Sequence, residues 1–150
     1  LIGEWEFYGL PLDISPAVLI PRPDTEVLAT KLIDAARGAG ACRILDLCAG
    51  SGCIGLAAAA NLPNARVLLG EHEPRLALDG GADGLDFYRV ICEKWRDALC
   101  ENGMLFFEVG IGQADQVLRI MRSHGFGDIQ IVKDLNNIPR VVYGTRVETI

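Results

Sequence analysis

The chain has 150 residues, the size of one domain, and it is long enough to bury a hydrophobic core. Half of its residues are hydrophobic and 23% are charged, a composition that excludes an intrinsically disordered chain. The formal net charge is −6 and no cluster of Lys or Arg is present, which argues against strong binding to nucleic-acid phosphates.

The first half of the chain predicts short strands, a helix, and then a strand-loop-helix unit. Residues 5–20 alternate short apolar pieces with Gly and Pro, which is typical of a small β-hairpin or two short strands. Pro23 is well placed to begin a helix whose apolar face ends at Gly38. The apolar run 43–48 predicts a buried parallel strand, followed by a helix from about residue 53 to residue 60 and a strand over 65–69.

The second half continues this alternation of helices and strands. Apolar residues recur at helical spacing over 86–101, before Asn102-Gly103, and again from residue 114 to Gly125. Residues 104–109 predict a strand between these two helices, and 128–133 and 140–147 predict two further strands. The order of elements predicts an α/β fold with a parallel sheet and an antiparallel finish.

Several features limit the location and chemistry of the protein. No apolar run approaches the roughly 20 residues that cross a bilayer, and residues 1–6 lack the plan of a secretory signal. We therefore expect a soluble, cytoplasmic protein. Five cysteines without a C-x-x-C pair, and only two histidines, favour reduced thiols over disulfides or a metal site.

The most informative stretch is residues 43–55, where the apolar run leads through a glycine loop into a helix. Gly50, Gly52 and Gly55 form the pattern G-x-G-x-x-G, which alone is a weak indication of a dinucleotide site. Asp46 argues against a dinucleotide, because a carboxylate at the strand end would repel a pyrophosphate. The ammonium and sulfonium groups of S-adenosylmethionine suit that carboxylate better. The alternative is that Asp46 only caps a turn and the glycines serve packing.

Three blocks of sequence together indicate a family. They are Leu19-Ile-Pro-Arg-Pro-Asp-Thr-Glu26, Asp46-Leu-Cys-Ala-Gly-Ser-Gly-Cys53 and Glu73-Pro-Arg-Leu-Ala-Leu-Asp-Gly-Gly-Ala-Asp-Gly-Leu85, with further similarity at 107–113 and 140–144. In these blocks the chain resembles the S-adenosylmethionine-dependent N5-glutamine methyltransferases, a family that modifies peptide chain release factors. The resemblance covers most of the chain.

The resemblance implies a fold and its division along the chain. The fold would be a Rossmann-like, seven-stranded class I methyltransferase sheet with helices on both faces. Residues 1–22 would form a β-hairpin and a lead-in segment, and residues 23–150 the S-adenosylmethionine-dependent methyltransferase domain.

The same resemblance implies a site and a reaction. The methionine end of the cofactor would be lined by Asp46, Cys48, Ala49, Gly50, Ser51 and Gly52. The amide nitrogen of the glutamine in the Gly-Gly-Gln loop of a release factor would attack the sulfonium methyl in line, with positioning and desolvation supplying most of the catalysis. Release factors would be the partners, with no membrane involved and nucleic acid not expected.

Two departures from the family pattern affect the site. The motif Asn-Pro-Pro-Tyr, expected to hold the substrate amide, does not occur in the chain, so no catalytic residue can be assigned. Glu71 lies 19 residues after Gly52, near the spacing of a ribose-binding acid, but its neighbours resemble the lead-in to the third block. We therefore expect that a segment is absent between about Val67 and Glu71, with a chain break near Gly70.

Other functions stay open from the sequence. A methyltransferase-like domain without the catalytic motif would act as a binding module. An NAD-dependent oxidoreductase would use the glycine loop differently. A third possibility keeps the chemistry and changes the acceptor, to a glutamine of a ribosomal protein or an amino group of nucleic acid.

Overall fold

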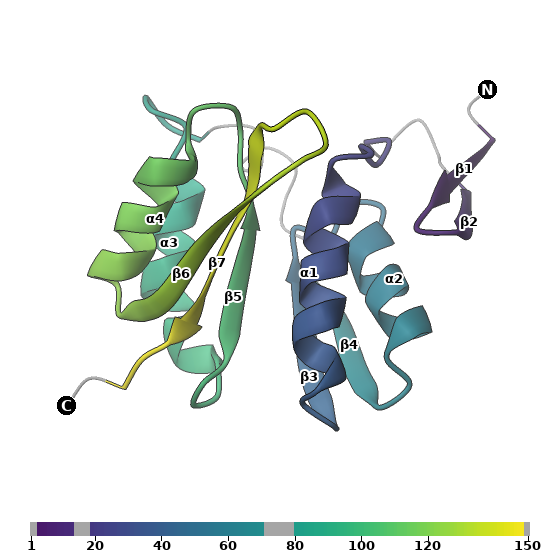
Figure 1. Cartoon of the computed structure of the whole chain (residues 1–150), viewed down its shortest axis with the longest axis horizontal. Coiled ribbons are helices and arrows are strands. Elements are labelled where there is room, and N and C mark those ends of the chain that lie inside the picture. The colour runs from purple at the N-terminus through teal and green to yellow at the C-terminus, as the bar shows by residue number, and fades with distance from the viewer. Residues whose placement is uncertain (1–2, 14–18, 71–79, 149–150) are drawn as a thin grey trace. The chain divides into compact units, whose positions relative to one another are not determined.

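A computed structural model describes residues 3–13, 19–70 and 80–148 of the chain. The chain forms two compact units, residues 1–77 and residues 78–150, each with its own hydrophobic core. Figure 1 shows the helices and strands of both units. No helix in the described ranges combines the length and the apolar character needed to cross a membrane.

The first unit contains an antiparallel hairpin, two helices and a parallel pair of strands. The turn of the hairpin is at Tyr8-Gly9, where both residues have positive φ, as tight turns require. The parallel pair places Asp46 opposite Leu69 and Leu47 opposite Gly70. The elements are β1 (Glu4–Phe7), β2 (Leu10–Asp13), α1 (Thr25–Arg37), β3 (Cys42–Leu47), α2 (Cys53–Asn61) and β4 (Ala65–Gly70).

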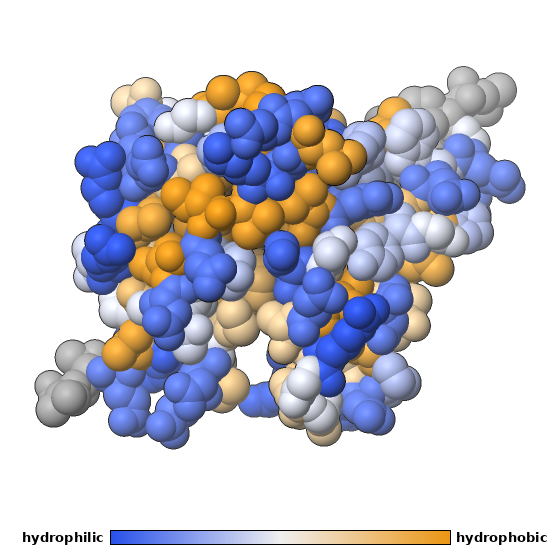
Figure 2. All heavy atoms as spheres, in the orientation of Figure 1, coloured by the Kyte–Doolittle hydropathy of each residue, from blue (hydrophilic) through white to orange (hydrophobic). Residues whose placement is uncertain are grey.

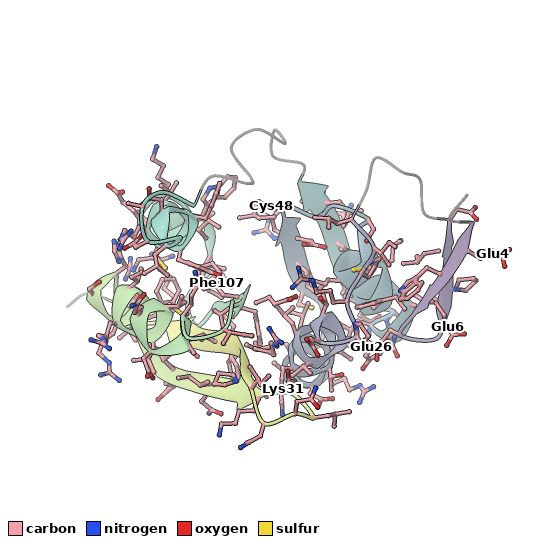
Figure 3. The ribbon with its side chains drawn as sticks, turned by 90° about the horizontal axis from the view of Figure 1, so that it is seen from above. Glu4, Glu6, Glu26, Lys31, Cys48 and Phe107 are labelled. Carbon is pink, nitrogen blue, oxygen red and sulfur yellow. The ribbon has the colours of Figure 1, made fainter. Side chains whose placement is uncertain are left out.

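The core of the first unit lies between the hairpin and the two helices. Phe7 comes from β1 and Ile33 from α1, and both are almost completely buried. Ala57 and Ala58 of α2 have no exposed area, and their small side chains let α2 approach its neighbours closely. Glu4 and Glu6 alternate with the apolar residues of β1 and lie on its outer side (Figure 3).

The second unit is a three-stranded sheet with helices on one face. Strand order is β5-β7-β6, with β7 antiparallel to both neighbours, so β5 and β6 run in the same direction. The elements are α3 (Asp86–Lys94), a 3-10 helix η1 (Arg96–Ala98), β5 (Met104–Glu108), α4 (Ala114–Ser123), β6 (Phe126–Lys133) and β7 (Pro139–Arg146).

Helices α3 and α4 pack on one face of this sheet. Phe107 lies on that face (Figure 3) and meets the ring of Tyr88 edge to face, with 5.1 Å between ring centroids. Val117 and Met121 of α4 are fully buried in the same cluster. On the other face the rings of Phe106 and Tyr143 stack, again at 5.1 Å. Figure 2 shows hydrophobic residues gathered over the β6 and β7 part of the face that it displays.

Most predicted elements are present, but the predicted helix over 86–101 is too long. Helix α3 ends at Lys94, and Trp95 is 43% exposed instead of covering the sheet. The reason is long-range bonding: Arg96 Nη2 donates to the carbonyl of Val147 at 2.6 Å, and Arg146 Nη1 donates to the carbonyl of Leu99. With these contacts the chain leaves the α-helix after Lys94 and continues as the 3-10 helix η1. The antiparallel finish is confirmed, and β3 and β4 form one parallel pair of the predicted parallel sheet. The strand predicted to be buried over 43–48 is not buried: every residue of β3 is partly or fully exposed.

The described strands belong to three separate sheets of two, two and three strands. The single seven-stranded sheet therefore stays a prediction. The sequence predicts a break near Gly70, between about Val67 and Glu71. Strand β4 runs unbroken from Ala65 to Gly70, so no break lies in the described part of that interval. The step from Gly70 to Glu71 lies outside the described residues, as does the first half of the third sequence block.

Candidate functional site

The loop predicted to bind a cofactor follows the carboxyl end of β3. Three of its residues have left-handed backbone conformations: Cys48 (φ 59°), Gly50 (φ 55°) and Gly52 (φ 72°). Two backbone hydrogen bonds fix the loop, from the N–H of Ala49 to the carbonyl of Gly70 at 3.2 Å and from the N–H of Gly52 to the carbonyl of Ala49 at 2.7 Å. The loop is therefore anchored to the end of β4.

Asp46 precedes this loop and points toward helix α2. Its Oδ2 accepts a hydrogen bond from the N–H of Gly55, in the first turn of α2, at 3.1 Å. Burial raises the pKa of this carboxyl, and the Gly55 N–H lowers it to a smaller extent. Capping was the alternative considered from the sequence, and it accounts for one carboxylate oxygen. The other oxygen, Oδ1, has no hydrogen-bond partner among the described residues.

Two glycines of the loop motif lie in tight packing. A Cβ at Gly55 would lie 3.2 Å from Cγ1 of Val67 and 2.3 Å from Cδ2 of Leu69, whose flexible side chain would have to turn away. A Cβ at Gly52 would lie 3.0 Å from Cδ1 of Leu69, at a positive φ. These contacts give Gly52 and Gly55 a packing role that needs no dinucleotide.

Open space faces the middle of the loop. A Cβ at Gly50 would meet only the carbonyl of Cys48, at 4.0 Å. Cys48 itself is exposed at the end of β3 (Figure 3). Partial desolvation of the sulfur and the nearby Asp46 charge raise the pKa of the Cys48 thiol, which makes it a poorer nucleophile. The loop offers a carboxylate and bare backbone to a ligand, and no activated nucleophile.

Glu26, the last residue of the first sequence block, has a structural role that sequence reasoning missed. Glu26, in the first turn of α1, accepts a hydrogen bond from the N–H of Tyr8 at 2.9 Å. Thr30, one turn later, donates to the carbonyl of Glu26 at 2.8 Å, and its hydroxyl oxygen lies 3.4 Å from that of Tyr8. Glu26 thus holds the turn of the hairpin against α1. The hydrogen bond joins Tyr8 and Glu26, which are 18 residues apart, so no local sequence pattern predicts it.

The carboxyl end of β5 carries a second ordered loop, in the other unit. The side chain of Gln113 accepts hydrogen bonds from the N–H of Gly110 at 3.0 Å and the hydroxyl of Tyr88 at 3.2 Å. It donates to the carbonyl of Gly84 at 3.2 Å. The same Tyr88 hydroxyl lies 3.1 Å from the carbonyl of Glu108, so its single hydrogen is shared between the two acceptors. One glutamine therefore fixes the loop after β5 to the loop before α3.

Metal binding has no support in the described ranges, where no three His, Cys, Asp or Glu side chains are grouped to hold an ion. A parallel strand pair, a glycine loop after the first strand and a helix starting from that loop instead form the cofactor-binding half of a Rossmann-like fold. Precorrin-6y C5,15-methyltransferase from Geobacter metallireducens shares this fold at 14% identity, with a TM-score of 0.60 over 90% of this chain and 94% of that one. The class of fold is therefore Rossmann-like, with the glycine loop at the carboxyl end of its first parallel strand.

Closer relatives narrow the class to a family, although no protein-family model matches the chain. A release factor glutamine methyltransferase from Geobacter sulfurreducens is 35% identical over 96% of this chain and 71% of its own length. The one from Thermodesulfovibrio yellowstonii is 31% identical over 95% and 74%. The release-factor-specific protein-(glutamine-N5) methyltransferase from Alicyclobacillus acidocaldarius, known from its crystal structure, is 30% identical in sequence. The two structures match with a TM-score of 0.71 over 91% of this chain and 100% of the Alicyclobacillus chain. The chain belongs to the release factor glutamine methyltransferase family.

Proposed function

We propose that the protein transfers a methyl group from S-adenosylmethionine to the side-chain amide nitrogen of a protein glutamine, in the Gly-Gly-Gln loop of a peptide chain release factor. The observation that carries this proposal is the similarity over 96% of the chain to a release factor glutamine methyltransferase. The cytoplasm, where release factors act, is the proposed location. Nucleic acid is not a proposed partner, because the chain is acidic and has no basic cluster.

We place the methionine end of the cofactor at Asp46 and the loop Cys48, Ala49, Gly50, Ser51 and Gly52. The fit rests on two features of this loop: Oδ1 of Asp46 has no partner among the described residues, and a Cβ at Gly50 would point into open space. When bound, the cofactor supplies an electrophilic methyl group on a cationic sulfur. Asp46 orients its ammonium group, and the backbone of Gly50 allows close approach.

We also propose that the working enzyme has a seven-stranded sheet completed by a segment between β4 and α3. The alignment with the Geobacter sulfurreducens relative spans 204 positions but takes in 96% of 150 residues here, about 144, so about 60 positions of the relative have no counterpart in this chain. Among the described residues β3 pairs only with β4, and β5 pairs only with β7. A central strand beside β3 would use its free edge and would carry the missing Asn-Pro-Pro-Tyr motif.

A second function is favoured if the 150-residue chain acts without the Asn-Pro-Pro-Tyr segment. The absence of Asn-Pro-Pro-Tyr favours a binding module that holds S-adenosylmethionine or a partner without methyl transfer. A ribosomal-protein glutamine or a nucleic-acid amino group is the alternative acceptor if transfer occurs.

Calorimetry of the chain with S-adenosylmethionine, S-adenosylhomocysteine and NAD tests the cofactor, and transfer of a radioactive methyl group to a release factor tests the reaction. We expect binding of the first two ligands, and label on the release factor that disappears when its Gly-Gly-Gln glutamine is changed to alanine. Binding without transfer supports the binding module. Binding of NAD and not of S-adenosylmethionine overturns the proposal.

A further inference from the structure

Leu69, near the end of β4, is a half-exposed leucine beside the loop proposed to bind the cofactor. Its exposed fraction is 49%. An exposed leucine is common on protein surfaces and by itself indicates nothing. Leu69 differs from its exposed neighbour Leu68, because successive side chains of a strand point to opposite faces of the sheet. Val67 packs against the core that contains α2, so Leu69 lies on that side of the sheet and Leu68 on the other.

The side chain of Leu69 lies against two glycines, one in the loop and one in the first turn of α2. Its Cδ1 is 3.0 Å from the point where a Cβ of Gly52 would be, and its Cδ2 is 2.3 Å from the corresponding point at Gly55. The next residue, Gly70, accepts the hydrogen bond from the N–H of Ala49 at its carbonyl. The end of β4 therefore contacts the loop through a side chain and through the main chain.

Leu69 is also next to Asp46. The two residues are partners in the register of β3 and β4, and Asp46 points to the same side of the sheet, toward Gly55. Oδ2 of Asp46 is 3.3 Å from the Cβ point at Gly55 that Cδ2 of Leu69 also approaches, so the carboxylate and the leucine lie side by side. A charged group and an apolar group are thus presented together at the carboxyl ends of two parallel strands, where open α/β sheets bind their ligands.

This pair of groups matches the methionine part of S-adenosylmethionine. In that part, two apolar methylene groups separate the carbon that bears the ammonium from the sulfur. We propose that Leu69 is a specificity-determining residue that packs on these methylene groups while Asp46 holds the ammonium; this rests on the proposed function. Covering the exposed half of the leucine favours binding through the hydrophobic effect. A polar side chain in its place would lose hydrogen bonds to water without gaining a partner.

Calorimetry of the full chain with two ligands tests this role. S-adenosylhomocysteine carries the whole amino-acid chain, whereas 5′-methylthioadenosine keeps the nucleoside and the sulfur but ends in a methyl group. We expect Leu69→Ala to raise Kd for S-adenosylhomocysteine about 3- to 10-fold and to change Kd for 5′-methylthioadenosine less than about twofold.

Two further variants complete the comparison. Leu69→Met keeps an apolar side chain of similar volume, so its Kd for S-adenosylhomocysteine should stay within about twofold of the wild-type value. Leu68→Ala is the matched control, because it makes the same change in the same strand on the opposite face, and it should alter neither Kd. Melting curves should show all three variants folded.

NMR of leucine methyl groups gives a second readout that needs no variant protein. A nuclear Overhauser effect should connect the Leu69 methyl groups with the methylene protons of bound S-adenosylhomocysteine, and none should involve Leu68. An unchanged Kd in Leu69→Ala, an equal loss for both ligands, or no such Overhauser effect in the bound complex would overturn the role of Leu69 alone. A wild-type chain that binds neither S-adenosylmethionine nor S-adenosylhomocysteine would overturn the proposed cofactor, and this inference with it.

Discussion

Asp46→Asn separates the electrostatic role of the carboxylate from its structural role. The substitution keeps an oxygen that can accept the Gly55 N–H, now 3.1 Å from Oδ2, and removes only the negative charge. A hydrogen bond to a charged group contributes about 1.5–3 kcal/mol, so losing the charge opposite the cofactor ammonium should raise Kd for S-adenosylmethionine about 10- to 100-fold. Calorimetry on the purified variant measures this directly.

Two controls sharpen the Asp46 experiment. Asp34→Asn makes the same change in net charge at an exposed ion pair with Arg37 on α1, and it should leave Kd unchanged. Asp46→Ala also removes the acceptor of the Gly55 N–H, so it should lower the free energy of unfolding by about 1–3 kcal/mol, which Asp46→Asn should not do. Wild-type affinity in Asp46→Asn would refute the assignment of this carboxylate to the cofactor.

The pH dependence of the Asp46 contribution has a definite sign. Its pKa is raised in the folded protein, so the folded chain binds this proton at a higher pH than the unfolded chain does. Folding stability from this group is therefore greatest below the ordinary value of 3.8 and declines as pH rises through the raised pKa. Cofactor affinity should change in the opposite sense, weakening as pH falls below that raised pKa, and Asp46→Asn should remove this dependence.

Three further substitutions test the packing and the loops. Gly55→Ala should lower the free energy of unfolding by about 1–3 kcal/mol in denaturant titrations, because its Cβ would lie 3.2 Å from Val67 and 3.3 Å from Oδ2 of Asp46 and would push the Leu69 side chain aside; an unchanged midpoint would contradict the helix position. Cys48→Gly should raise that free energy by about 0.5–1 kcal/mol by relieving a φ of 59°, and a loss of stability would count against this conformation. The pKa of the Asp134 carboxyl is lowered, chiefly by the hydrogen bond from the N–H of Ile138. The stability that Asp134 contributes to the fold is therefore present above pH 3.8 and is lost as the pH falls through the lowered pKa. Asp134→Asn should lower the melting temperature at neutral pH and make the melting temperature depend less on pH in acid.

Elements set by local pattern could be predicted from the sequence. The β3 strand is a mainly apolar run that contains Ile44, Leu45 and Leu47, and the glycines after it allow the positive φ values that the loop adopts at Gly50 and Gly52. The end of α3 could not be predicted in this way. Arg96 bonds to Val147 and Arg146 to Leu99, and these partners are about 50 residues away along the chain.

The candidate site was predictable in position but not in detail. The carboxylate of Asp46 and the glycines were identified from their spacing, whereas its bond to Gly55 depends on how α2 packs against β4. The bond from Tyr8 to Glu26 and the three bonds to Asp134 arise from tertiary structure and leave no periodic signal. Sequence reasoning therefore predicted the glycine loop after β3, where we propose that the cofactor binds, and missed the side chains that hold the other loops in place.

The bare face of the parallel pair is the physical reason to expect a further segment. Leu45 of β3 and Leu68 of β4 are opposite each other in the register and are 44% and 64% exposed, next to Arg43 and Arg66 on the same face. Parallel sheets are normally covered on both faces, because the crossover helices that connect their strands pack there. Burying two half-exposed leucines would contribute about 2 kcal/mol, and pairing the free edge of β3 would remove a row of unpaired backbone groups. A segment that supplied both a central strand and a covering helix would therefore stabilise the same unit that carries the cofactor loop.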